Sequence, residues 1–65
     1  MSKPKNVKQA MDNDGYVVKN IYSKGSKTIR VDFKPRFANS KNENCSFWIN
    51  RDYFKRNYPR IYNKF

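Results

Sequence analysis

Cations and aromatic rings that alternate with apolar residues are the side chains best suited to chemistry in this chain. Arg30 and Lys34 alternate in this way along one short stretch, and Ser46 and Trp48 along another. Aromatic rings stack on the bases of single-stranded nucleic acids while cations follow the phosphates. These residue types in this pattern therefore favour a nucleic-acid-binding surface.

The charge of the whole chain favours the same kind of partner. Fifteen Lys and Arg stand against five Asp and Glu, a formal net charge of +10, whereas roughly 2–8 charges suffice for the solubility of a small domain. A chain this basic attracts polyanions, although a merely solvated basic surface or a drift in composition would give the same count. The candidate contact residues are Lys27, Arg30, Lys34, Arg36, Lys41, Ser46, Trp48, Arg51, Lys55 and Arg56.

Catalysis is not expected from this set of residues. The chain has no histidine for acid–base chemistry, and Asp12 and Asp14 lie where helix capping explains them. Gly15 and Gly25 are the only glycines, so no Gly-rich phosphate-binding loop exists. The single cysteine, Cys45, allows no internal disulfide, and with no histidine beside this lone thiol a zinc site built from protein ligands alone is not expected. We therefore predict a non-enzyme without catalytic residues, metal or cofactor.

Residues 26–35 form the segment around which a fold can be built. Three apolar residues, Ile29, Val31 and Phe33, alternate with polar ones, which is the pattern of a half-buried β-strand. Pro35 ends this strand, because proline cannot donate to a continuing ladder. The apolar residues are predicted to face the core, and the polar ones to face the partner.

Two more strands are predicted beside this one. Tyr16–Tyr22 is rich in β-branched and aromatic residues, but its alternation is imperfect, so either both faces are partly covered or a bulge resets the register. A turn over Ser23–Ser26 joins it to the central strand as a hairpin. After a polar loop over Arg36–Asn44, Cys45–Ile49 is the third strand, with Ser46 and Trp48 pointing away from the core.

Helices are expected at both ends of the chain. A flexible leader at residues 1–5 precedes a short helix over Lys5–Asn13, with Pro4 in its first turn; a disordered basic arm is the alternative. Asn50 can cap a C-terminal helix, in which Pro59 forces a kink or a fresh start. The predicted fold is α+β: a three-stranded antiparallel β-meander packed by a C-terminal helix, with a short N-terminal helix, in one small domain over residues 1–65 that is expected to be a complete product.

The order of these segments resembles a known family. The run Lys27–Phe33, a polar loop, the run Cys45–Ile49 and a helix with Tyr53 and Phe54 are similar to the single-strand-binding core of the positive-cofactor transcription coactivators. The resemblance covers about half of the chain. It implies single-stranded DNA binding on the sheet and a homodimer formed through helices, and its candidate contacts are Lys27, Arg30, Ser46 and Trp48.

The chain also departs from that family. Asn42–Asn44 replaces the Gly-rich approach to the third strand, the helix begins about one residue later, and the opening helix and the Pro59 segment have no counterpart. The layout also resembles the three-strand-plus-helix DNA-binding arm of some integrases, which presents its sheet to the major groove. On that resemblance too the sheet is the binding surface.

Two functions are consistent with these features. The first is largely sequence-independent binding of nucleic acid, DNA rather than RNA and single-stranded rather than duplex, through phosphate and stacking contacts. The alternative is an inhibitor or adaptor that docks on an acidic surface of a host protein, with the same cations and rings as hot spots. A tiny Lys- and Asn-rich chain is typical of phages and mobile elements of low-GC bacteria. Without an apolar span or signal sequence, we expect no membrane partner and a cytoplasmic location, in the host cell if the chain is phage-encoded.

The predicted site on the sheet depends on Trp48 being uncovered. If the N-terminal segment or a second copy of the chain covers Trp48, this ring is simply part of a core. The binding surface would then shift to the C-terminal helix and to the Arg36–Asn44 loop.

Overall fold

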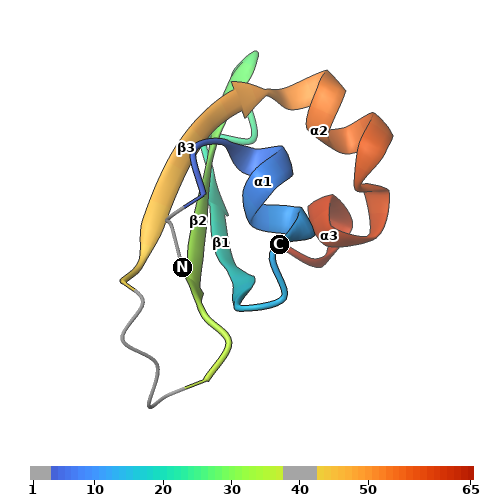
Figure 1. The fold of residues 1–65 in the computed structure, drawn as a ribbon. Coiled ribbons are helices and arrows are strands. Elements are labelled where there is room, and N and C mark those ends of the chain that lie inside the picture. Colours follow the sequence, from blue (N-terminus) through green and yellow to red (C-terminus); the bar gives the residue numbers. More distant parts are fainter. Residues whose placement is uncertain (1–3, 38–42) are drawn as a thin grey trace.

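A three-stranded antiparallel sheet forms the centre of the fold (Figure 1). The computed structural model describes residues 4–37 and 43–65. Strands β1 (Tyr16–Tyr22), β2 (Thr28–Pro35) and β3 (Cys45–Asn50) pair in the order β1-β2-β3, and the helices are α1 (Val7–Asp12), α2 (Arg51–Asn57) and α3 (Pro59–Lys64). The predicted α+β meander is confirmed, with two helices at the C-terminal end in place of one. No helix in this part of the chain has the length and apolar character needed to cross a membrane.

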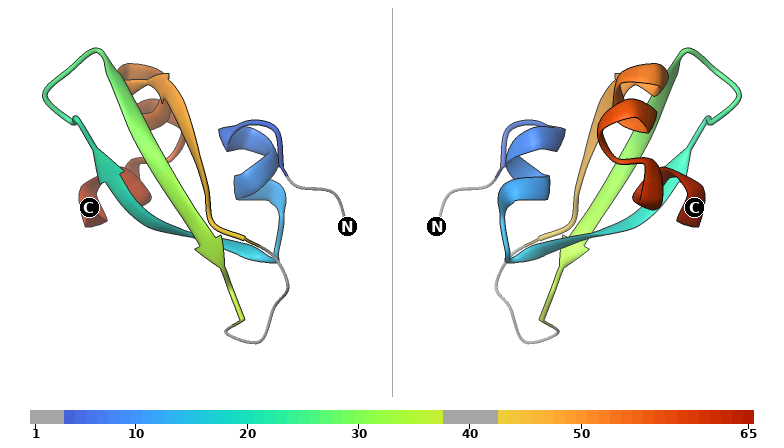
Figure 2. Two further views of the ribbon diagram at one scale, coloured as in Figure 1. Left: turned by 90° about the vertical axis from the view of Figure 1, so that its left-hand side faces the viewer. Right: turned by 90° about the vertical axis from the view of Figure 1, so that its right-hand side faces the viewer.

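All three helices lie on the same side of the sheet (Figures 1 and 2). Ile29, Val31 and Phe33 of β2 face them and are fully buried, as their alternation predicts. These residues form one apolar cluster with side chains of α1 and with Phe54 of α2. Among the described residues, no helix covers the opposite face, which Figure 2 shows from the front in its left view. We call this uncovered side the open face, and α1 does not lie across it.

A β-bulge between Val18 and Asn20 explains the irregular pattern of β1. Val18 lies opposite Phe33 and Ile21 lies opposite Val31, so both point to the core although they are three residues apart. Beyond the bulge, Tyr22 points to the open face. Of the two alternatives that the sequence allows for this strand, the bulge is confirmed.

Helix α1 begins later than predicted. Asn6 caps it, since Asn6 Oδ1 accepts a hydrogen bond from the backbone N–H of Gln9 at 2.8 Å, which satisfies an amide without a partner inside the helix. Pro4 therefore precedes the cap and is not in the first turn, so that expectation was wrong. Of the leader predicted over residues 1–5, residues 1–3 lie outside the described residues, while Pro4 is buried and the Lys5 N–H donates to Gln9 Oε1 at 2.9 Å.

Asn50 and Pro59 define where the C-terminal helices begin. Asn50 Oδ1 accepts a hydrogen bond from the Tyr53 N–H at 3.0 Å, and Asp52 lies in the first turn of α2, where the helix dipole favours a negative charge. Helix α2 ends before Pro59, because proline lacks the amide that would continue it. The same residue then starts α3, since the first position of a helix needs no N–H.

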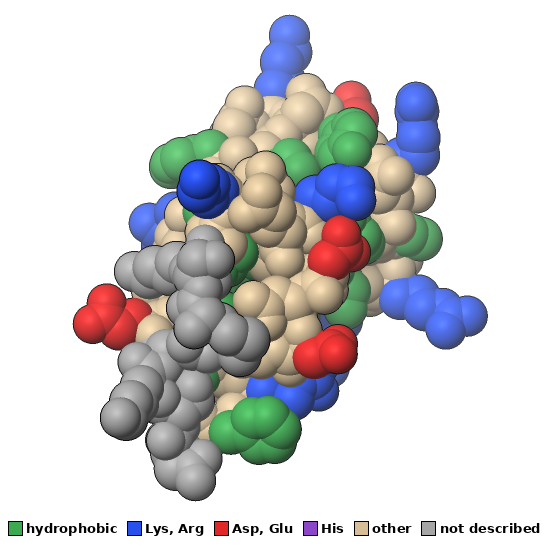
Figure 3. Space-filling view, in the orientation of Figure 1, with side chains coloured by type: hydrophobic (Ala, Val, Ile, Leu, Met, Phe, Trp, Pro, Cys, Tyr) green, Lys and Arg blue, Asp and Glu red, His purple; other side chains and the backbone are tan. Residues whose placement is uncertain are grey.

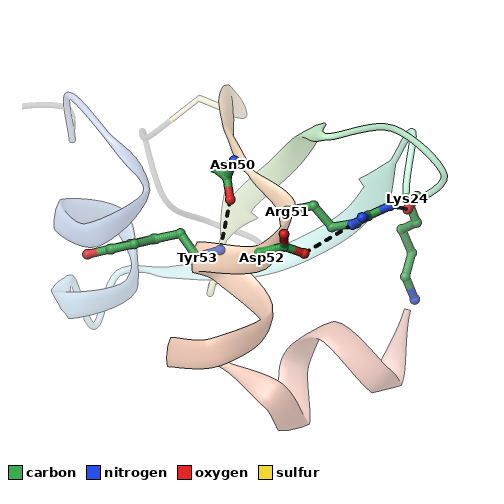
Figure 4. A network of polar contacts seen from close by, with 5 residues as sticks. All are labelled: Lys24, Asn50, Arg51, Asp52 and Tyr53. Carbon is green, nitrogen blue, oxygen red and sulfur yellow. Dashed lines mark hydrogen bonds and ion pairs between the residues drawn. The ribbon is translucent and has the colours of Figure 1, made fainter.

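The β1–β2 turn is joined to the C-terminal helices (Figure 4). Lys24 Nζ donates to the Tyr62 carbonyl oxygen at 2.9 Å and lies 4.3 Å from the centroid of the Tyr62 ring. The Arg51 side chain donates from Nη1 to the Lys24 carbonyl oxygen at 3.4 Å. The hairpin turn and both C-terminal helices therefore hold one another in place.

Candidate nucleic-acid interface

A row of three side chains, one from each strand, crosses the open face. The ladder places Tyr22 opposite Arg30, and Arg30 opposite Trp48. The guanidinium carbon of Arg30 lies 4.5 Å from the centroid of the Tyr22 ring, a distance at which a cation is attracted to the ring face. Trp48 is 64% exposed and Tyr22 is 40% exposed. The Tyr22–Arg30–Trp48 row therefore combines two accessible rings with a cation between them.

The hydrogen-bond pattern of the ladder brings Arg30 and Trp48 together. The Arg51 N–H donates to the Lys27 carbonyl oxygen at 2.7 Å, across the end of the β2–β3 ladder. Hydrogen-bonded and non-hydrogen-bonded pairs alternate along antiparallel strands, so Arg30 and Trp48 form a non-hydrogen-bonded pair, with Cα atoms about 4.5 Å apart. The same alternation turns the backbone N–H and C=O of Trp48 away from β2, towards the free edge of β3.

An acidic residue lies beside the row. Asp32 lies opposite Asn20 on one side and Ser46 on the other, and its Oδ1 is 3.2 Å from Arg30 Nε. Both atoms are inaccessible to solvent. They form an ion pair, but their geometry is not that of a hydrogen bond. Asp32 thus restrains Arg30 and offsets part of its charge on the face that would meet phosphates.

Replacing Asp32 by Asn is expected to tighten binding of a single strand by at most about fivefold at low salt, because a partly exposed ion pair is worth about 0.2–1 kcal/mol. Asn keeps the shape of the side chain and removes the negative charge beside Arg30. Titration of oligothymidylate at several salt concentrations measures this change. Asp52→Asn is the control, because its side chain lies on α2, on the helical side of the sheet. Equal tightening in both variants would show that only net charge matters.

Two further candidate residues lie on the open face. Lys34 lies opposite Val17, Ser46 lies opposite Asp32, and both are exposed. Lys27 is exposed but precedes β2, and its carbonyl oxygen is bonded to Arg51 at the end of the sheet. Lys27 is therefore outside the row.

The remaining candidate residues lie away from the row. Arg36 follows β2, and its backbone N–H and its Nε donate to the carbonyl oxygens of Gly15 at 2.8 Å and Asp14 at 2.6 Å. This arginine therefore fastens the loop before β1. Lys41 lies outside the described residues.

The three candidates on α2 are on the helical side of the sheet. Arg51 bonds to the hairpin turn and pairs with Asp52, Nε to Oδ1 3.4 Å. Lys55 and Arg56 are exposed in the last turn of α2. In Figure 3, Lys and Arg side chains project from several parts of the visible surface and do not gather in one patch. None of these three residues belongs to the Tyr22–Arg30–Trp48 row.

Tyr22 belongs to the row; the sequence suggests it as a second stacking ring beside Trp48, although it is not in the list of candidate contact residues. The strand pattern leaves its direction undetermined until the bulge is located. Its aromatic type on a predicted strand was the available signal.

Comparison of the chain with protein-family models, with curated proteins and with solved structures finds no match. The geometry of the open face is therefore the basis for assigning a function.

Proposed function

We propose that this chain binds single-stranded nucleic acid, DNA in preference to RNA, on the open face of its sheet. The Tyr22–Arg30–Trp48 row, on a face that no described helix covers, is the observation that supports the proposal most directly. Its rings stack on bases, and Arg30 and Lys34 contact phosphates. The net charge of +10 attracts the strand from a distance.

A single strand suits this surface better than a duplex. The two rings are separated by two strand spacings, about 10 Å. Trp48 is accessible to an unpaired base, and so is the part of the Tyr22 ring that Arg30 does not cover. Bases in a duplex are stacked on each other, so the rings would meet only sugars and groove edges. Because stacking does not depend on which base is present, sequence preference is expected to be weak.

The fluorescence of Trp48, the only tryptophan in the chain, reports directly on this site. Titration with a single-stranded DNA, the matching duplex and the matching RNA should show the strongest quenching with the single-stranded DNA. The logarithm of the affinity should fall linearly with the logarithm of the salt concentration. If none of the three nucleic acids binds at low salt, the proposal is overturned.

The alternative partner is an acidic surface of a host protein, which would use the same rings and cations. A stoichiometric protein captured from a nuclease-treated bacterial lysate, together with no affinity for oligonucleotides, would favour that role. An origin in a phage or mobile element, and a cytoplasmic location, are part of the nucleic-acid proposal and of its alternative alike.

A further inference from the structure

An open hollow of about 320 Å³ lies beside β3. Trp48 and Ile49 both line it. Because neighbouring residues of a strand point to opposite faces, a hollow that touches both lies at the edge of the strand, on the side that β2 does not occupy. Tyr53 and Tyr58 from the C-terminal segment form another wall, and Figure 4 shows the Tyr53 side chain reaching from α2 towards α1. The volume is at the lower end of the range for ligand pockets, about 300–1,000 Å³.

The start of α1 adds an amide, Asn6, and a cation, Lys8, to the aromatic side chains of the hollow, and none of the described residues that line it is acidic. Asn6 Oδ1 is engaged in capping α1, so its amide nitrogen is the part of the side chain suited to donate to a ligand. Lys8 Nζ lies 3.2 Å from Asp12 Oδ2. That hydrogen bond and charge, and to a lesser extent Tyr58 and Tyr53, raise the pKa of Lys8.

The hollow continues the path of the row. Trp48 belongs to both the row and the hollow. A nucleic-acid strand that crosses the open face from Tyr22 over Arg30 therefore reaches the hollow at the edge of β3. The distance from Tyr22 to Trp48 is about 10 Å, which is short enough for a few consecutive nucleotides to span the row. The next base along the strand would arrive at the hollow.

We propose that the hollow takes one unstacked nucleobase of the bound strand, in contact with Trp48 and Tyr53, with Lys8 on the adjoining phosphate. This inference rests on the proposed function and adds to it a site for a single base at the end of the path. Aromatic rings with an amide donor and a cation match the ring, the edge and the phosphate of a nucleotide. The continuity with the row favours a nucleotide over an aromatic side chain of a partner protein.

A double-mutant cycle tests this site: a side chain is changed in the protein, and a base is removed from the oligonucleotide. The probes are hexathymidylate and its single-abasic versions, one for each position, and the protein variants are Tyr53→Ala and Tyr53→Phe. Removing the base at one position should weaken binding to the wild type by roughly fivefold or more, the lower limit for stacking on one ring. The same removal should weaken binding to Tyr53→Ala less than it weakens binding to the wild type, because the contact with Tyr53 is already lost and only the contact with Trp48 remains. Tyr53→Phe keeps the ring and should behave as the wild type does.

Each outcome of this cycle either supports or overturns the base site in the hollow. If hexathymidylate binds but no position couples to Tyr53, the hollow is not a base site and the proposal for the open face stands. If the wild type binds no oligonucleotide, both are overturned and a side chain of a partner protein becomes the better occupant. Lys8→Gln, a change at an exposed residue, gives a second reading that does not alter the hollow's rings: the salt slope should fall by about one, and an unchanged slope would contradict a phosphate contact at Lys8.

Discussion

Replacing Trp48 by Ala should weaken single-strand binding by about 1–3 kcal/mol, roughly 5- to 150-fold, which is the value of stacking one base on an aromatic ring. Trp48 is 64% exposed, so its loss should leave the fold intact, and β3 keeps its ladder with β2. Because this variant has no tryptophan, its affinity is measured by the fluorescence anisotropy of a labelled oligothymidylate.

Phe37→Ala is the matched control for this variant. Phe37 is 62% exposed, close to the value for Trp48, and does not belong to the row. Its replacement should leave the affinity unchanged, and Trp48→Phe should retain most of the binding because a ring remains. Equal losses in Phe37→Ala and Trp48→Ala would indicate non-specific contact with exposed rings, and an unchanged affinity in Trp48→Ala would rule out stacking at this position.

The strand pattern was sufficient to predict the open face at β2 and β3. A slip of one residue in β2 would move Ile29, Val31 and Phe33 from the core into water, so their alternation fixes the register. The same argument assigns Trp48 of β3 to the opposite side. These two strands supply Arg30 and Trp48, which are two of the three members of the row.

Tyr22 could not be placed in the same way. A bulge reverses the faces of every residue beyond it, and the composition of β1 does not say where the extra residue lies. The structure places the irregularity between Val18 and Asn20. Only the pairing with β2 turns Tyr22 towards Arg30.

The roles of the basic residues are the hardest part of the site to predict from residue type. Arg36 and Arg51 remain predicted phosphate contacts, and each also donates to a backbone carbonyl oxygen within the fold. A guanidinium bonds to either kind of acceptor, so residue type alone cannot distinguish a ligand contact from an internal one. The hollow was likewise beyond prediction, because its walls come from α1, β3 and the C-terminal segment, which only the folded chain brings together.

Replacing Phe54 by Ala is expected to unfold the domain or to leave it barely stable. Phe54 is 0% exposed, and no other residue of α2 or α3 is buried. Removing a core Phe costs about 3–5 kcal/mol, whereas a 65-residue domain has about 3–10 kcal/mol in total at 0.05–0.15 kcal/mol per residue. Urea unfolding followed by far-ultraviolet circular dichroism measures the loss.

Tyr53→Ala, at the preceding position of α2, provides the control for stability. Tyr53 is 52% exposed, so its loss should cost less than about 1 kcal/mol. Phe54→Leu retains an apolar side chain in the core and should remain folded with a smaller loss, so a variant is available if Phe54→Ala does not fold. Because Phe54 packs on the face opposite the row, folded Phe54→Leu should bind oligothymidylate as the wild type does. If it unfolds more easily and also binds less tightly while fully folded, the helical layer and the open face are not independent, and contacts through the sheet must be shaping the row.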